Sequence, residues 1–238
     1  MSDKFAIFGE RCSGTNVLEQ LVWQNFKLNV TTEFGFKHWP RREFNWSVLE
    51  LPVVLIAREP VGYLSSMYRS AWHCSDELKE MNFSSFIRAE WKNVHNEDSG
   101  TKPHDSRYGE EMMCERHLET GTRYRNVLEM RSDKLRQLKR IFEDVPCVSY
   151  VRFDELLSDQ EAVVRRVEHE LSLVRTAPEI SVVDSYKGGS SFRRRLYNAT
   201  LGRFISPVSR VIDVSVEDKE YIYQNLDLDI EREFGLVD

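Results

Sequence analysis

The stretch KFAIFGERCSGTN, residues 4–16, has the most informative pattern in the sequence. It begins with a short apolar run at residues 4–8, after which Gly9 and Gly14 bracket a polar loop. Beyond Gly14, apolar side chains recur at helical spacing, at Val17, Leu18, Leu21 and Val22. The stretch therefore predicts a strand, a glycine-bounded loop and a helix.

Two further segments repeat this order of elements. Residues 53–57, VVLIA, have the composition of a strand that is buried on both faces of a parallel sheet, and Pro60 suits the first turn of a following helix. Residues 147–153 predict a third strand, and an amphipathic helix follows at about residues 160–171. Three such units predict an α/β fold of the three-layer type: an open, mostly parallel sheet with helices on both faces. Ligands of such sheets bind beyond the carboxyl ends of the strands.

The length of 238 residues suits one domain, and we predict a single domain over residues 1–238. Residues 72–124 lose periodicity, which predicts an irregular insertion or a lid. Residues 215–234 return to a helical pattern, and Gly235 suits a helix C-cap.

The composition excludes several classes of protein. No stretch is apolar enough to cross a bilayer, and the run of four apolar residues from Phe5 is too short for a secretory signal. The four cysteines lack CxxC spacing and companion histidines, so we expect reduced thiols, no metal site and a cytoplasmic location. The net charge of −6 argues against a nucleic-acid-binding surface. An acid-free basic stretch at residues 187–210 is, by itself, typical of a solvated face.

The loop at residues 9–16 has the two-glycine spacing of a Walker A loop, which wraps backbone N–H groups around phosphates at a helix N-terminus. Thr15 and Asn16, however, stand where a nucleoside triphosphatase has its lysine and its magnesium-binding hydroxyl. A donor with one bridging phosphate and a sulfuryl group carries less charge at this loop than the β- and γ-phosphates of a nucleoside triphosphate. Backbone amides, hydroxyls and one or two cations can hold such a donor.

This loop resembles that of the sulfotransferases, which usually reads Lys-Ser-Gly-Thr-Thr, and more closely that of bacterial-type relatives with Gly-Glu-Arg-x-Ser-Gly-Thr-Asn. The resemblance implies a P-loop fold and 3′-phosphoadenosine 5′-phosphosulfate as the donor. Cys12 stands where many members have lysine, so the sequence does not identify the cation that stabilises the departing phosphate. The candidates are Arg11 and Lys37. The residues implied in donor binding at this loop are Arg11, Cys12, Ser13, Gly14, Thr15 and Asn16.

Three later segments are also similar to the family. Arg58 ends a predicted strand and Ser66 follows eight positions later, the pattern with which the family grips the 3′-phosphate. Residues 151–159 resemble an Arg-Tyr-Glu-Asp-Leu-Leu segment of architectural role. A looser similarity, equally typical of a flexible turn, implies a loop that closes on the 3′-phosphate, with residues Lys187, Gly188, Gly189 and Arg193.

The segment GFKHWP, residues 35–40, offers candidates for the chemistry of sulfuryl transfer. His38 is the candidate general base, because an imidazole with a pKa near ~6.5 can accept a proton at neutral pH, and Lys37 is the candidate cation. Adjacent residues of a regular strand point to opposite sides, so only one of Lys37 and His38 would face the donor there. Trp39 and Pro40 indicate that a short second strand ends here, which relaxes this restriction. Glu10 is the alternative base.

Two other functions remain open from the sequence: a P-loop nucleotide kinase or phosphotransferase, and an inactive nucleotide-binding module of the sulfotransferase type. The acceptor could be a carbohydrate, a lipid or a small metabolite, and the oligomeric state is open. We expect no metal in the reaction.

Overall fold

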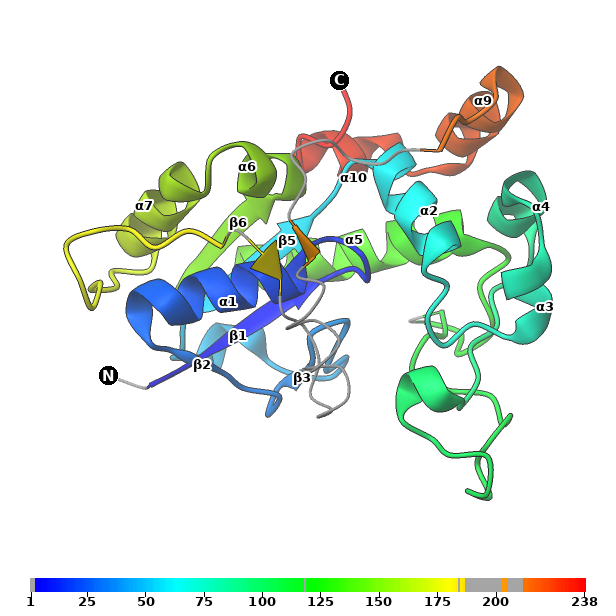
Figure 1. Ribbon diagram of the computed structural model, residues 1–238, viewed down its shortest axis with the longest axis horizontal. Coiled ribbons are helices and arrows are strands. Elements are labelled where there is room, and N and C mark those ends of the chain that lie inside the picture. The colour runs from blue at the N-terminus through cyan, green and yellow to red at the C-terminus, as the bar shows by residue number, and fades with distance from the viewer. Residues whose placement is uncertain (1–2, 118, 184, 187–202, 205–211) are drawn as a thin grey trace. The chain divides into compact units, whose positions relative to one another are not determined.

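The computed structural model describes residues 3–117, 119–183, 185–186, 203–204 and 212–238 (Figure 1). The chain forms two compact units. The first unit comprises Met1–Arg58 and Arg140–Ser209, and the second comprises Glu59–Lys139 and Arg210–Asp238. The single domain expected for residues 1–238 stays a prediction.

A parallel four-stranded sheet forms the centre of the first unit. Its order is β2 (Asn29–Val30), β1 (Lys4–Gly9), β5 (Val53–Ala57) and β6 (Val148–Arg152). Each neighbouring pair runs parallel, as predicted for an α/β fold. β1 and β5 therefore end side by side, and the segments that follow them leave the sheet at the same edge.

Three helices of the first unit follow these strands: α1 (Thr15–Phe26), α6 (Phe153–Ser158) and α7 (Gln160–Glu170), all labelled in Figure 1. Phe153, which the sequence assigned to the third strand, begins α6 instead. The reason is local, because the Glu155 carboxylate accepts a hydrogen bond from the backbone N–H of Arg152 (3.1 Å) and starts the helix there.

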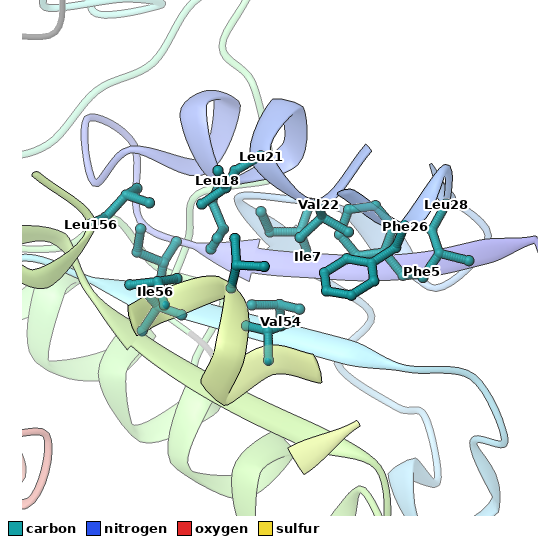
Figure 2. Close-up of a cluster of buried hydrophobic side chains, with 14 of the residues drawn as sticks. Phe5, Ile7, Leu18, Leu21, Val22, Phe26, Leu28, Val54, Ile56 and Leu156 are labelled. Carbon is teal, nitrogen blue, oxygen red and sulfur yellow. The ribbon is translucent and has the colours of Figure 1, made fainter. Parts of the chain in front are cut away.

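One hydrophobic core joins these helices to one face of the sheet. Figure 2 shows the apolar side chains of α1 lying against those of β1 and β5. The side chains alternate in β1 and β5, so that every second residue points to these helices. β5 has no exposed residue at all, which confirms a strand buried on both faces. On the other face, the Phe8 ring packs edge-on against Trp46 in the short helix η1 (Trp46–Val48), with centroids 5.4 Å apart.

The segment expected to hold a short second strand forms a small antiparallel hairpin outside the main sheet. Its strands are β3 (Gly35–Phe36) and β4 (Trp39–Pro40), and the rings of Phe36 and Trp39 stack with centroids 5.2 Å apart. In the main sheet, the strand after α1 is β2. A second small antiparallel pair joins β7 (Ser185–Tyr186) and β8 (Arg203–Phe204).

The described part of the second unit is mainly helical. Pro60 is the first residue of α2, as predicted, and the Glu59 carboxylate caps this helix by accepting from the N–H of Gly62 (2.8 Å). Residues 72–124 contain short helices rather than a wholly irregular loop. The further helices are α3 (Asp76–Glu80), α4 (Phe83–Arg88), η2 (Glu97–Ser99), α9 (Val216–Asn225) and α10 (Leu228–Glu233), and α5 (Val127–Asp144) contributes to both units.

A buried ion pair links two helices of the second unit. Arg131 of α5 and Glu231 of α10 form a two-bonded ion pair (2.6 and 2.7 Å) with both side chains fully buried. The Arg131 guanidinium also lies 4.8 Å from the ring centre of Tyr63. No helix among the described residues is both long and apolar enough to cross a membrane.

A second buried acid attaches the 72–124 segment to α5. Glu115 accepts hydrogen bonds from Trp91 (3.0 Å) and Asn93 and forms an ion pair with Lys134 of α5. These contacts give the segment a defined attachment within the second unit.

Candidate functional site

The loop between β1 and α1 has a backbone shaped by two left-handed residues. Cys12 has φ 61° and Gly14 has φ 93°. Gly14 caps α1 through its carbonyl, which accepts from the N–H groups of Val17 (3.0 Å) and Leu18 (3.1 Å). The first N–H groups of a helix have no partner within the helix, and short loops with left-handed residues can present such groups to an anion.

Both glycines of this loop are required by close neighbours. A Cβ atom on Gly9 would lie 2.5 Å from the carbonyl oxygen of Ile56 in β5. A Cβ atom on Gly14 would lie 2.6 Å from a ring carbon of Phe153. Inside the loop, the buried Ser13 hydroxyl donates to the Glu10 carbonyl (2.6 Å). The loop is therefore fixed between the neighbouring strand, the start of α6 and its own hydrogen bond.

Two buried arginines accompany the loop. Arg11 lies within it, Arg58 directly follows β5, and each is only 5% exposed. An Arg58 N–H donates to the carbonyl oxygen of Cys12 (3.3 Å), and the guanidinium lies 4.4 Å from the centre of the Phe153 ring. Positive charge therefore lies within the loop, at Arg11, and beside it at the end of the neighbouring strand, at Arg58.

The turn of the β3–β4 hairpin docks on this same loop. The N–H of Gly9 donates to the carbonyl of Lys37 (2.9 Å), and His38 Nδ1 lies 2.8 Å from the carbonyl oxygen of Gly9. Lys37 Nζ contacts the side-chain oxygen of Asn16 and lies 3.4 Å from a carboxylate oxygen of Glu19. Because the two residues lie in a turn, both side chains reach the loop, one at each end.

The contact with Gly9 determines which nitrogen of His38 carries a proton. A carbonyl oxygen only accepts hydrogen bonds, so Nδ1 must be the donor. In the neutral ring, Nε2 is then the nitrogen with the lone pair. This is the tautomer in which a histidine can take a proton at Nε2.

The environment of Lys37 acts on its pKa in two directions. Its side chain is 17% exposed, and burial lowers the pKa of the ammonium below its usual range. The Glu19 carboxylate opposes this effect by its charge and its hydrogen bond. Lys37 is therefore a cation whose charge depends on its neighbours.

The structure brings most of the predicted site residues together in the first unit: Glu10, Arg11, Cys12, Ser13, Gly14, Thr15, Asn16, Lys37, His38 and Arg58. Ser66 is a partly buried residue of α2 in the second unit. The remaining predicted residues, Lys187, Gly188, Gly189 and Arg193, lie outside the described part of the chain.

Two residues at this site were missed from the sequence. Glu19 lies three positions after Asn16 on α1, a spacing that puts both on one helix face, so it could have been found. Phe153 follows β6 as Arg58 follows β5, and adjacent parallel strands end at the same edge. What the sequence could not give is the ring's position against Gly14.

The second unit has a pocket of its own at the end of α2. Its volume is about 390 Å³, and its lining includes Tyr68, Trp72, Lys79 and Asp98. Lys79 and Asp98 form an ion pair of 3.1 Å. In the described ranges, no group of three or more His, Cys, Asp or Glu side chains could hold a metal ion. The expectation of a metal-free reaction stays a prediction.

Comparisons with known proteins add no relative. No protein-family model matches the chain, and neither a curated protein nor a solved structure is significantly similar to it.

Proposed function

We propose that this protein is a P-loop-type sulfotransferase that moves a sulfuryl group from 3′-phosphoadenosine 5′-phosphosulfate to a hydroxyl or amine of an acceptor. The observation that carries the proposal is the docking of Lys37 and His38 on the glycine-bounded loop. A cation and a proton acceptor on an anion-binding loop are what the transfer requires.

The loop fits the 5′ side of such a donor. Its two crowded glycines keep side chains away from the backbone, and its end is the N-terminus of the twelve-residue helix α1, which favours negative charge. Arg11 and Arg58 add buried positive charge to the loop. Lys37 is, with Arg11, one of the two proposed cations for the loop that has Cys12 in place of lysine, and its ammonium reaches the end of the loop from the hairpin turn.

The chemistry needs one proton transfer and one site of positive charge. The donor, when bound, supplies the sulfuryl group. His38 takes the acceptor's proton on Nε2 as the acceptor atom bonds to sulfur and the bond from sulfur to the bridging oxygen breaks. Lys37 and Arg11 stabilise the electron pair that stays on that oxygen, which leaves with 3′,5′-adenosine bisphosphate.

The 3′-phosphate is assigned to Arg58 and Ser66. Arg58 has a planar guanidinium that can bind a phosphate with two hydrogen bonds, and this guanidinium lies over the Phe153 ring. Ser66 is assigned to this phosphate only from its position in the sequence, eight residues after Arg58. The loop with Lys187, Gly188, Gly189 and Arg193 remains the proposed cover of this phosphate.

The position of Lys37 also favours a second candidate, a P-loop phosphotransferase. Such an enzyme requires a lysine at the terminal phosphates, and Lys37 could act there in place of the residue missing from the loop. The two candidates differ in their donor and in their need for Mg²⁺. An inactive nucleotide-binding module is the third possibility, and only turnover separates it from the first.

One assay tests all three. The protein is incubated with ³⁵S-labelled donor and, separately, with ³²P-labelled ATP, each with pooled glycans, lipids and small alcohols or amines, in excess chelator and in Mg²⁺. We expect labelled sulfate on an acceptor in chelator, at an undiminished rate. Transfer of phosphate that needs Mg²⁺ would support the kinase, and binding of the donor without transfer would support the inactive module.

A further inference from the structure

Lys37 is held by two groups on one face of α1. Its ammonium contacts the side-chain oxygen of Asn16 at the start of the helix and lies 3.4 Å from a carboxylate oxygen of Glu19. Residues three apart on a helix lie on the same face, so both oxygens contact the same ammonium.

We propose that Glu19 is a positioning residue for Lys37, which holds the ammonium in its charged form against the first turn of α1. The catalytic consequence rests on the proposed function, whereas the contact itself does not. Glu19 does not touch the reacting groups in this role. It acts through Lys37.

The surroundings of Lys37 explain why a carboxylate is needed. The side chain of Lys37 is 17% exposed, Asn16 is neutral, the Phe36 ring lies 6.0 Å from the ammonium, and His38 is the next residue in the turn. Burial alone favours loss of the proton, and Glu19 supplies the negative charge that counteracts it. Without that charge, Lys37 releases its proton at a lower pH.

The sign of the effect separates positioning from donor binding. Glu19 is an anion beside a site for anions, so its removal does not weaken attraction of the donor. Its removal lowers the fraction of enzyme with a charged Lys37 and lowers it most on the alkaline side. Loss of a residue that merely shaped the binding site would weaken donor binding at every pH.

The direct test is the titration of the Lys37 amine in the donor-free protein. The variant is Glu19→Gln, which keeps the shape of the side chain and removes its charge. The matched control is Glu161→Gln on α7, which removes the same charge from an exposed pair with Arg165 (2.8 Å). Lysine side-chain ¹³C NMR gives the midpoint, and the signal that disappears in Lys37→Arg identifies Lys37.

We expect the midpoint of Lys37 to fall in Glu19→Gln and to stay unchanged in Glu161→Gln. Equal midpoints in the wild type and Glu19→Gln overturn the proposal. This result needs no turnover, so it stands apart from the proposed function.

The second arm measures sulfuryl transfer against pH. In Glu19→Gln we expect kcat on the alkaline side to fall about two- to fivefold, the range expected for a partly exposed ion pair, without a rise in donor Kd. Glu19→Asp should recover part of the loss. A raised donor Kd with normal kcat overturns the positioning role. A wild type that transfers no sulfuryl group defeats the proposed function, and the titration alone then decides whether Glu19 holds the charge.

Discussion

His38 Nδ1 lies 2.8 Å from the carbonyl oxygen of Gly9, the last residue of β1. The N–H of the same glycine donates to the carbonyl of Lys37 (2.9 Å), so the hairpin turn is bonded to both polar groups of one residue. The end of a central strand thereby fixes the orientation of the imidazole. Because Nδ1 donates, the proton acceptor of the neutral ring is Nε2.

The first prediction is that His38→Asn lowers turnover by about 10²–10⁴-fold and leaves donor affinity nearly unchanged. An asparagine amide can still donate to the Gly9 carbonyl, but it cannot take a proton. Steady-state rates and calorimetric donor binding measure the two effects. The wild-type rate should also fall on the acid side, where the base is protonated.

His104→Asn is the matched control for this prediction, because His104 is an exposed residue of the 72–124 segment. It should behave as the wild type. Near-normal turnover of His38→Asn with an unchanged acid limb contradicts the assignment, and Glu10 becomes the next base to replace.

The second prediction concerns the crowding of Gly14. Gly14→Ala should lower the free energy of unfolding by about 2–5 kcal/mol, because it adds a clash with Phe153 to the strain of a left-handed alanine. Gly109 has φ 81° with nothing within 4 Å of its added Cβ, so Gly109→Ala has the strain alone, about 1–2 kcal/mol. Urea denaturation compares the two variants.

The Phe153 ring can be tested as the cause of this difference. Adding Phe153→Val to Gly14→Ala should recover part of the lost stability, since valine has neither of the two ring carbons, Cδ2 and Cε2, that crowd the added Cβ. If the two glycine variants lose the same free energy, the close approach of Phe153 has no energetic role.

The sequence predicts best those elements whose burial is complete. β5 was predicted to the residue because five consecutive apolar side chains suit a strand covered on both faces. Phe153 was assigned wrongly because an aromatic residue after a strand pattern favours a longer strand, whereas the Glu155 carboxylate starts a helix. Local propensity does not include that hydrogen bond.

The site was predictable where spacing carries the information. The glycine-bounded loop and the Lys37–His38 pair stand out in the sequence, but their contact depends on a hairpin of two-residue strands held by Gly9. Strands this short have too little pattern to reveal their partners. The role of Ser66 stays a prediction, since its element belongs to the second unit.

The third prediction addresses the buried pair in the second unit. Glu231→Gln should lower the free energy of unfolding by about 3–5 kcal/mol, because it leaves the fully buried Arg131 without its countercharge. The double variant Arg131→Met/Glu231→Leu should lose less than Glu231→Gln, because no isolated charge remains. Chemical denaturation measures all three proteins. If the double variant is the least stable of them, the loss of an uncompensated charge does not explain the stability, and the prediction is wrong.

The last prediction concerns Arg58 and the nucleotide. The protein should bind 3′,5′-adenosine bisphosphate about ten- to a hundredfold more tightly than 5′-adenosine monophosphate, because the extra phosphate gains charge-assisted hydrogen bonds of roughly 1.5–3 kcal/mol. Arg58→Ala should lose this preference. Arg58→Lys should keep only part of it, because a lysine lacks the planar fork of the guanidinium, which lies 4.4 Å from the centre of the Phe153 ring. Arg165→Ala, at an exposed position of α7, is the control and should bind as the wild type. Calorimetry with both nucleotides measures the preference.

Equal wild-type affinities would remove the case for a 3′-phosphate site, and with it the main distinction between this donor and an ordinary nucleotide. A preference that survives in Arg58→Ala would instead direct attention to Lys187 and Arg193, the other basic residues assigned to that phosphate.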